Sequence, residues 1–384
     1  MNTDPGRDRY ITLVEAATGT PYRSGNSFTI LQNGDQIFPA MLEAIRSAKT
    51  SIEFVTFVYW RSDIATEFAN ALAERARAGV QVRLLVDAVG GAIMNSRTVW
   101  DLERAGVKVA WFRPARWQYL RKLNNRTHRK ILVVDAILAF AGGVGIADEW
   151  TGNADSPRHW RETHVRIAGP ACADLRASFA ESWLEAGRER LKPIPELAPA
   201  GSVAVHTASS TAGTRPTEIE RLFLGVIAAT CTRLWITTAY FVPNEQLIAA
   251  LAAAVRRGVD VRVLTNGPLS NHRVTHLAGR ASYQRLLAAG VRILEYQATV
   301  LHSKVLSADG AWATVGSTNL DDRSLVLNDE INVSVVDHAI VAGLDQQFEA
   351  DCTRAREIHS SHWAVRGWSS RLAESGAGLF RHQL

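Results

Sequence analysis

Two copies of one short motif carry the residues in this sequence whose types and spacing can do chemistry. Both copies read His-x-Lys-x4-Asp, and the interval between the two histidines equals the interval between the two lysines. Chance is a poor explanation for such a repeat. The copies are His128, Lys130 and Asp135 in the first half, and His302, Lys304 and Asp309 in the second half.

Each motif lies in an apolar run that predicts a strand, and residues two positions apart in a strand project to the same side. Each motif therefore places an imidazole beside an ammonium group. If the two halves of the chain meet, two imidazoles and two ammonium groups gather at one site. Because clustered cations without a counter-charge are unfavourable, the motifs predict an anionic ligand.

A phosphate diester fits this combination of groups. One histidine can attack phosphorus and form a phosphohistidine, while the other protonates the leaving alcohol and then deprotonates the acceptor. The lysines can bind the non-bridging oxygens. We expect no metal and no other cofactor, because neither motif has a second imidazole or thiolate at zinc-ligand spacing. A single histidine in an apolar strand would more often be a core residue, but the duplication favours chemistry.

The elements that must position the motifs also occur twice. In each half an apolar helix leads to a strand rich in β-branched and aromatic residues, then to a second helix ending at a glycine, and then to a buried strand. This alternation predicts an α/β fold, with a mixed sheet in each half, helices on its faces and a pseudo-twofold axis between the halves. The matching segments are residues 39–48, 51–59, 65–79 and 80–87, and residues 221–229, 234–241, 245–258 and 259–265.

The stretch before residue 216 is rich in proline and small polar residues, a composition that breaks regular structure and suits a connector. We therefore expect a first lobe over residues 1–195, a linker over residues 196–215 and a second lobe over residues 216–384.

The composition sets limits on the class of protein. The chain has 384 residues, of which 47% are hydrophobic, so it is globular, with two domains or one large one. A net charge of +5 favours anionic partners, either lipid phosphate or nucleic acid. Three cysteines that are far apart in the sequence, Cys172, Cys231 and Cys352, predict free thiols in a reducing compartment.

The N-terminal residues show no apolar run after a basic stretch, so we expect no secretory signal and no anchor at this end. The most apolar segment, residues 131–147, contains Asp135 and several glycines and is shorter than the roughly 20 apolar residues of a spanning helix. If this protein works on a membrane, we expect it to act from the surface.

The motifs and the phrases around them resemble the phospholipase D superfamily, and within it the bacterial cardiolipin synthases. The phrases are HRKILVVDAILAFAGGVGIADEW, WRETHVRIAGPA, ITTAYFVPNEQL and GSTNLDDRSLVLNDEINV, and the resemblance runs over residues 28–357. It implies two tandem αβα lobes with mixed sheets, related by a pseudo-twofold axis, with one active site at their interface. It also implies a ping-pong phosphatidyl transfer through a phosphohistidine.

The resemblance further implies roles for single residues. His128 is the expected nucleophile and His302 the expected acid/base, although the symmetry of the motifs leaves the two roles exchangeable. Glu162 and Glu330 match the acids that orient the two histidines by accepting a hydrogen bond from a ring nitrogen. The aspartates of both motifs are expected to brace strand ends rather than to do chemistry.

The turns that follow the motifs are expected to bind phosphate. Ser317 and Asn319 match the family pattern and offer a hydroxyl and an amide to the phosphate oxygens. In the first copy Gly143 follows the synthase-like form, but Gly145 stands where the family usually has asparagine. The first half therefore lacks one donor.

A basic and aromatic segment precedes the first motif. It suits an anionic bilayer, with rings at the headgroup level and cations on phosphate, and the same mixture could bind single-stranded nucleic acid or form a packed loop with a solvated rim. Our candidates for contact with a membrane are Arg116, Trp117, Arg121 and Lys122.

The sequence thus predicts a phosphatidyltransferase of the cardiolipin synthase type, which moves a phosphatidyl group from phosphatidylglycerol or a similar phospholipid to a lipid hydroxyl. A phospholipase D-type phosphodiesterase is the alternative within the same chemistry. A nuclease or nucleic-acid-binding protein is the alternative of another class. The expected partners are phospholipids and the inner face of the cell membrane, with the protein cytoplasmic and peripheral, and we expect neither nucleic acid nor an obligatory protein partner.

Overall fold

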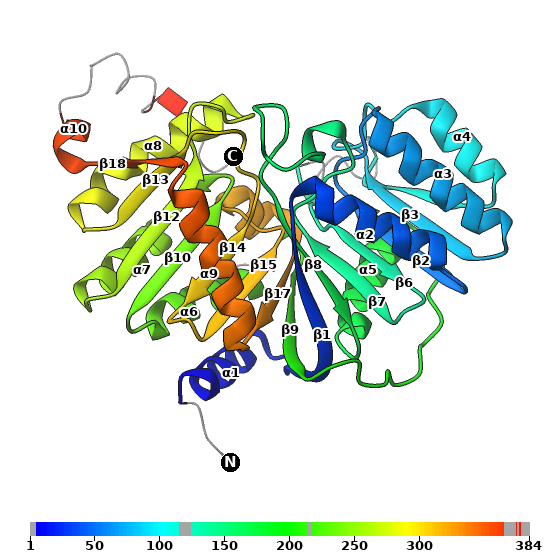
Figure 1. Cartoon of the computed structure of the whole chain (residues 1–384), viewed down its shortest axis with the longest axis horizontal. Helices are drawn as coiled ribbons and strands as arrows, with labels where there is room; N and C mark the ends of the chain where they lie inside the picture. The colour runs from blue at the N-terminus through cyan, green and yellow to red at the C-terminus, as the bar shows by residue number, and fades with distance from the viewer. Residues whose placement is uncertain (1–4, 115–123, 214–216, 365–373, 375, 378–384) are drawn as a thin grey trace.

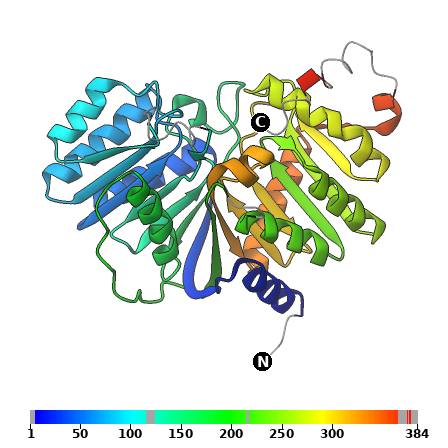
Figure 2. The same ribbon diagram turned by 180° about the vertical axis from the view of Figure 1, so that it is seen from behind.

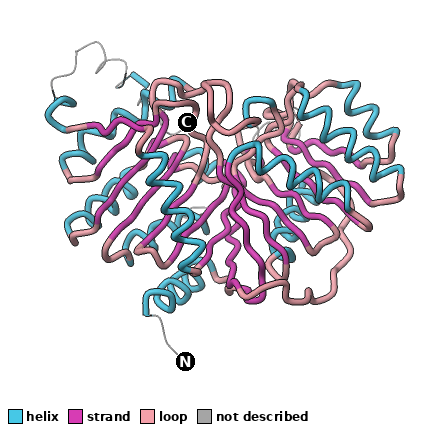
Figure 3. Tube along the Cα trace, in the orientation of Figure 1, coloured by secondary structure: helices cyan, strands magenta, loops and turns pink. Residues whose placement is uncertain are grey.

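The computed structural model describes residues 5–114, 124–213, 217–364, 374, 376 and 377. Two lobes lie side by side, and each has strands covered by helices on both faces (Figure 1). All but two of the described strands form one mixed sheet that continues from one lobe into the other (Figure 3), and the remaining two pair with each other. The predicted α/β fold with two lobes of mixed sheet is confirmed.

The strands of the first half are β1 (Arg23–Gln32), β2 (Ser51–Thr56), β3 (Gln81–Asp87), β4 (Lys108–Phe112), β5 (Arg126–Thr127), β6 (Ile131–Val134), β7 (Leu138–Gly142) and β8 (Thr163–Ala168). The strands of the second half are β9 (Val203–Ser210), β10 (Arg233–Thr238), β11 (Phe241–Val242), β12 (Asp260–Asn266), β13 (Arg292–Tyr296), β14 (Val305–Ala308), β15 (Trp312–Gly316), β16 (Leu320–Asp321), β17 (Asn328–Val335) and β18 (Ala355–Ile358).

The helices of the first half are α1 (Pro5–Thr18), α2 (Asn33–Ser47), α3 (Asp63–Arg77), α4 (Ser96–Arg104) and α5 (Cys172–Glu185). The helices of the second half are α6 (Glu218–Ala229), α7 (Glu245–Arg256), α8 (Arg273–Ala288), α9 (His338–Cys352) and α10 (Ser360–Ala364).

The strand order is nearly the same when it is read outward from the centre of the sheet in either direction. β1 and β9 lie at the centre and pair antiparallel. β8, β7, β6, β2, β3 and β4 follow on the side of β1, and β17, β15, β14, β10, β12, β13 and β18 follow on the side of β9. The pseudo-twofold axis therefore passes between β1 and β9.

The stretch expected to be a linker, residues 196–215, contains a central strand. Residues 203–210 form β9, which pairs with β17 on one side and with β1 on the other. The prolines that precede β9 made its sequence resemble a connector, although the side chains of β9 are nearly all buried. Because β9 leads into α6 as β1 leads into α2, it is the second copy of β1. The boundaries 1–195, 196–215 and 216–384 remain predictions.

The two halves are joined by packing as well as by the sheet. One core cluster contains Phe179 of α5 and Leu344 of α9, together with strand residues of both halves such as Val165 and Val333. Helix α1 also crosses over, because its buried Tyr10 packs in the core of the second lobe with α6. Figure 2 shows α1 against the second lobe from behind.

The three cysteines are free, with Cys172 buried and Cys231 exposed. Within the described part of the chain, we find no helix with both the length and the apolar character needed to cross a bilayer.

The aspartates of the two motifs stand in equivalent turns and have positive φ angles of 51° for Asp135 and 54° for Asp309. Asp135 accepts the backbone N–H of Thr50 at 2.7 Å and that of Ser51 at 2.9 Å, and so ties the β6–β7 turn to the start of β2. Asp309 makes the matching bond to the N–H of Thr232 before β10. Burial raises the pKa of both carboxyl groups, but these N–H donors outweigh it and hold the pKa below its usual range.

Asp309 also accepts the Arg9 guanidinium at 2.6 Å and the Tyr10 hydroxyl at 2.9 Å, so it anchors α1. We expect Asp309→Ala to lower the free energy of unfolding by about 2 to 4 kcal/mol, and Asp135→Ala by roughly 1 kcal/mol less, because charged hydrogen bonds are lost. Urea titration checks this. Asp101→Ala, at an exposed carboxylate, is the control. Equal losses for the two motif aspartates would contradict the anchoring of α1.

Candidate active site

Each motif histidine is held by the strand of the opposite half. β5, just before His128, pairs parallel with β17, and the N–H of His128 donates to the carbonyl of Asp329 at 2.8 Å. In the same way, Leu301 forms a parallel bridge with Arg161, and the N–H of His302 donates to the Arg161 carbonyl at 2.7 Å. The local structure of each motif therefore depends on the other half.

The carboxylates cross over as well. His128 Nδ1 lies 2.9 Å from Glu330 Oε1, and His302 Nδ1 lies 2.7 Å from Glu162 Oε2. Both glutamate side chains are fully buried. Each imidazole of one half is thus oriented by a carboxylate of the other half, which leaves the second ring nitrogen for chemistry.

The two imidazoles line one cavity of about 410 Å³ between the lobes. Lys130 and Asn319 also line it. The ammonium group of Lys130 donates to the carbonyl of His128 at 2.8 Å, and that of Lys304 lies 3.1 Å from Nε2 of His302. The structure therefore brings both histidines and both lysines of the motifs to one place.

Burial controls the charge state of these groups. It lowers the pKa of His128 to about 4, against the opposing effect of Glu330. It lowers the pKa of His302 well below its usual value, and the two motif lysines act in the same direction. It also lowers the pKa of Lys130 to about 7 and that of Lys304 to about 8. At neutral pH both imidazoles are neutral, and the lysines lie close to their titration points.

The two orienting carboxylates differ. The Ser317 hydroxyl donates to Glu330. Burial raises the pKa of Glu330, but His128, Lys130 and Ser317 outweigh it, and the pKa is lowered. Burial raises the pKa of Glu162 above its usual range. The equivalent of Ser317 in the first half is Gly143, which has no hydroxyl to offer to Glu162.

The two turn residues therefore contact the carboxylates. A Cβ at Gly143 would lie 2.6 Å from both carboxylate oxygens of Glu162, so only glycine fits there. Ser317 lies against Glu330 and accepts the N–H of Ile331 at 3.0 Å. In the structure both residues lie against the acids behind the histidines. The contact with phosphate that the sequence led us to expect for them stays a prediction.

Val58 and Trp150 leave no room for a side chain at Gly145, where asparagine was expected. A Cβ there would lie 2.9 Å from Cβ of Val58 and 3.0 Å from the Trp150 ring. The indole N–H of Trp150 donates to Glu162 at 3.2 Å, and its ring meets His302 edge-on with centroids 5.1 Å apart. The Trp150 indole thus supplies a donor to the Glu162 carboxylate.

Sequence reasoning missed two residues that hold the motifs in place. Asp87, at the end of β3, accepts the N–H of Thr127 at 3.1 Å and the guanidinium of Arg126 at 3.0 Å. Asn266, at the end of β12, accepts the N–H of Leu301 at 2.8 Å. Each thus fixes the residue just before a motif histidine. Asp87 and Asn266 hold equivalent positions in the two halves, and this repetition of a polar residue at a strand end could have identified them from the sequence.

The remaining candidates lie elsewhere. The motif aspartates sit in the turns described above. Arg116, Trp117, Arg121 and Lys122 fall outside the described residues.

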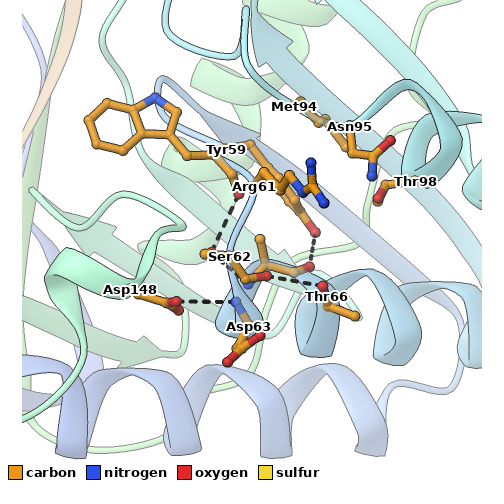
Figure 4. Close-up of a pocket in the computed structure, with 11 residues that line it drawn as sticks. Tyr59, Arg61, Ser62, Asp63, Thr66, Met94, Asn95, Thr98 and Asp148 are labelled. Atoms are coloured by element: carbon orange, nitrogen blue, oxygen red, sulfur yellow. Dashed lines mark hydrogen bonds between the residues drawn. The ribbon is translucent and has the colours of Figure 1, made fainter.

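Figure 4 shows a second pocket, of about 450 Å³. Trp60 lines both this pocket and the cavity between the lobes. Its lining comes from the first half, and Asp148 there accepts the N–H of Asp63 at 3.3 Å and that of Ile64 at 3.1 Å at the start of α3. No residue of either motif lines it. We therefore do not assign the chemistry to this pocket.

The fold and the paired motifs define a protein of the phospholipase D-like class, and comparisons with known proteins narrow this. The family model described as cardiolipin synthase, PLD-like domain, matches residues 41–183 and 224–352. The chain belongs to this family.

Individual relatives agree with this assignment. Cardiolipin synthase A of Pseudomonas fluorescens strain Pf-5 is 36% identical over 341 residues, which cover 88% of this chain and 71% of that protein. The probable cardiolipin synthase YwiE of Bacillus subtilis strain 168 is 31% identical over 379 residues, which cover 97% of this chain and 75% of that protein. The crystal structure of phosphatidylserine synthase from Haemophilus influenzae has a TM-score of 0.72 at 12% identity, covering 98% of this chain and 100% of that one. That structural match shows the shared fold.

The contact between Gly143 and Glu162 gives a test of the crossed pairs. We expect Gly143→Ala to push the Glu162 carboxylate away from His302 and to lower kcat by at least about a hundredfold, the scale of general acid–base catalysis. Gly225→Ala in α6 is the control, because a Cβ there meets no atom closer than 3.5 Å. Thermal melting establishes that both variants fold. Wild-type turnover in folded Gly143→Ala would contradict the positioning of His302 by Glu162.

Proposed function

We propose that this protein transfers a phosphatidyl group from phosphatidylglycerol, or a similar phospholipid, to a hydroxyl group of a second lipid and thereby makes cardiolipin. The observation that carries the proposal is the pair of imidazoles on one cavity, each hydrogen-bonded to a carboxylate of the opposite half. The relatives named cardiolipin synthase, which match 88% to 97% of the chain, favour lipid over other phosphodiesters.

In the first half-reaction, Nε2 of His128 attacks phosphorus, an N–P bond forms, and the P–O bond to the headgroup breaks. Glu330 holds Nδ1 of the same ring and stabilises the positive charge that develops there. His302 gives its proton to the leaving oxygen. A bound phosphate favours the protonated form of His302, because a nearby negative charge raises the pKa of an imidazole.

The positions of the lysines support this assignment of roles. The ammonium group of Lys304 lies 2.9 Å from Nδ1 and 3.1 Å from Nε2 of His302, so it faces both ring nitrogens, whereas the described hydrogen bonds of the His128 ring are on Nδ1 alone. His128 therefore has the more accessible lone pair. Lys130, Lys304 and the amide of Asn319 bind the non-bridging oxygens and stabilise the charge of the transition state.

In the second half-reaction, His302 takes the proton of the acceptor hydroxyl, whose oxygen attacks phosphorus as the N–P bond breaks. Water in place of the lipid hydroxyl would give hydrolysis. The rings of Trp150 and Trp160 lie 5.1 and 5.5 Å from the His302 ring, centroid to centroid, and reduce the access of water. This aromatic surround favours transfer over hydrolysis.

We also propose that the protein is cytoplasmic and acts as a peripheral protein at the inner face of the cell membrane. Exposed apolar side chains lie near the cavity on both lobes. Val89, Ile93 and Trp100 are 51% to 61% exposed in and after the β3–α4 loop, and Leu269 and Val274 are 40% and 52% exposed around the start of α8. Val89 itself lines the cavity. The segment with Arg116 and its neighbours remains a candidate for the same contact.

One assay separates the candidate functions. The purified protein is given phosphatidylglycerol vesicles and, separately, single-stranded or nicked DNA, all with a chelator present. We expect cardiolipin and free glycerol in equal amounts, measured by lipid chromatography and a glycerol assay. Phosphatidic acid as the sole lipid product would indicate a phosphodiesterase instead. DNA cleavage with inert lipid would indicate a nuclease.

The two histidines have separable roles. We expect His128→Ala and His302→Ala each to abolish turnover, because one variant loses the nucleophile and the other loses the acid/base that activates the acceptor hydroxyl. His302→Ala keeps the nucleophile, so it alone should slowly accumulate acid-labile phosphate on the protein from labelled lipid. His338→Ala, at an exposed histidine on α9, is the matched control and should keep full activity. Labelled phosphate on His128→Ala alone would exchange the two roles, and substantial turnover by either variant would rule out a shared site.

A further inference from the structure

The two sides of the cavity differ in chemistry although they come from a duplicated scaffold. The first half contributes apolar and aromatic side chains, among them Phe57, Val58, Trp60, Trp150 and Trp160. The first half also contributes Arg126. The second half contributes four polar residues, Asn319, Asp321, Ser324 and Asn328, which we call the polar wall. Its other lining residues besides the motif histidine are Tyr240, Asn271, His272, Thr275 and Arg323.

The repeat shows where the two halves diverged. At the same distance from the motif histidine, the first half has Gly145 for Asn319, Ala147 for Asp321 and Trp150 for Ser324. Counted from the orienting glutamates, Trp160 takes the place of Asn328. Every member of the polar wall thus has an apolar counterpart. Such a one-sided change points to two different groups in the cavity, one apolar and one polar.

The polar wall presents hydrogen-bond acceptors that lack donors. Oδ1 of Asn319 and Oδ1 of Asn328 are buried and have no hydrogen-bond partner in the described residues. The two residues are only 2% and 5% exposed. The amide of Asn328 is oriented by Glu330, because its Nδ2 lies 3.5 Å from a carboxylate oxygen that can only accept. A buried acceptor without a donor is unfavourable, so these oxygens are arranged for a ligand that donates.

Asp321 adds a carboxylate to the same wall. It is 2% exposed and accepts the N–H of Ser324 at 2.7 Å. Burial raises its pKa to about 7, with Glu330 acting in the same direction. The mechanism above does not use this group.

A phosphate diester cannot satisfy the unpaired oxygens of Asn319 and Asn328, because its own oxygens only accept hydrogen bonds. The lysines and histidines serve the phosphate. Hydroxyl groups can donate to amide and carboxylate oxygens, and two or three of them on neighbouring carbons would meet acceptors spread along one wall. We propose that Asn319, Asp321 and Asn328 form a subsite for a polyhydroxylated headgroup such as glycerol and select for it. This inference rests on the proposed function and names the group that the cavity prefers.

The test compares two lipids that differ only in their hydroxyl groups. Phosphatidylglycerol and phosphatidylpropanol with the same acyl chains are offered separately, each with the same excess of ethanol as a common acceptor, and kcat/KM for total headgroup release is measured by the alcohol set free. We expect the wild-type protein to prefer phosphatidylglycerol by at least about tenfold, because an unmatched hydroxyl subsite leaves buried acceptors unpaired. Asp321→Ala and Asn328→Ala should each lower this preference by about tenfold.

Asp321→Asn keeps an acceptor oxygen and should therefore retain most of the preference for phosphatidylglycerol. If Asp321 had only a structural role, the preference would not depend on this acceptor oxygen. Asp101→Ala, an exposed carboxylate on α4, is the matched control and should leave the ratio unchanged. Consumption of both lipids with no preference, or with a preference that both alanine variants retain, would overturn the subsite and leave the proposed function standing. If neither lipid is consumed, the proposed function fails and the subsite fails with it.

Discussion

The candidate site depends on one interaction, the hydrogen bond between an imidazole of one half and a carboxylate of the other. Glu330 holds His128, and Glu162 holds His302. Neither half contains a complete pair, so the two lobes must keep a fixed relation to one another. The central β1–β9 pair and the core cluster shared by α5 and α9 provide that relation. The continuous sheet is therefore a requirement of the chemistry as well as a source of stability.

The duplicated scaffold holds a site that is not symmetric, and the asymmetry begins behind the histidines. Ser317 donates to Glu330, whereas Gly143 leaves room for Glu162 to contact the Trp150 indole. One carboxylate is thus held in its anionic form more firmly than the other. In a ping-pong reaction one imidazole carries phosphorus and the other carries protons, so the two rings need different surroundings. The scaffold supplies equivalent positions, and single substitutions within it supply the different environments.

Much of this arrangement could be predicted from local sequence patterns. Helix and strand periodicity, and the glycines that end the paired helices, give the α/β fold and its duplication. The motif spacing places each lysine beside its histidine. The strand β9 escaped prediction because the neighbouring prolines are typical of a connector, while its partners β1 and β17 are distant in the sequence. The crossing of α1 to the second lobe has the same cause, since burial of Tyr10 depends on a surface formed by α6.

The crossed His–Glu pairs belong to the same class of long-range information. Each glutamate follows its own motif in the sequence, but the strand that carries it lies beside the motif of the other half, as the β5–β17 pairing shows. Which histidine each glutamate contacts is therefore decided only by the register of the assembled sheet. Burial then sets the chemistry, because it keeps both imidazoles neutral and brings the two lysines close to their titration points. A bound phosphate favours the charged form of these cations, so substrate binding and proton uptake are linked. Burial thus disfavours a cluster of unpaired positive charges, and the charge needed for catalysis develops when a phosphate binds.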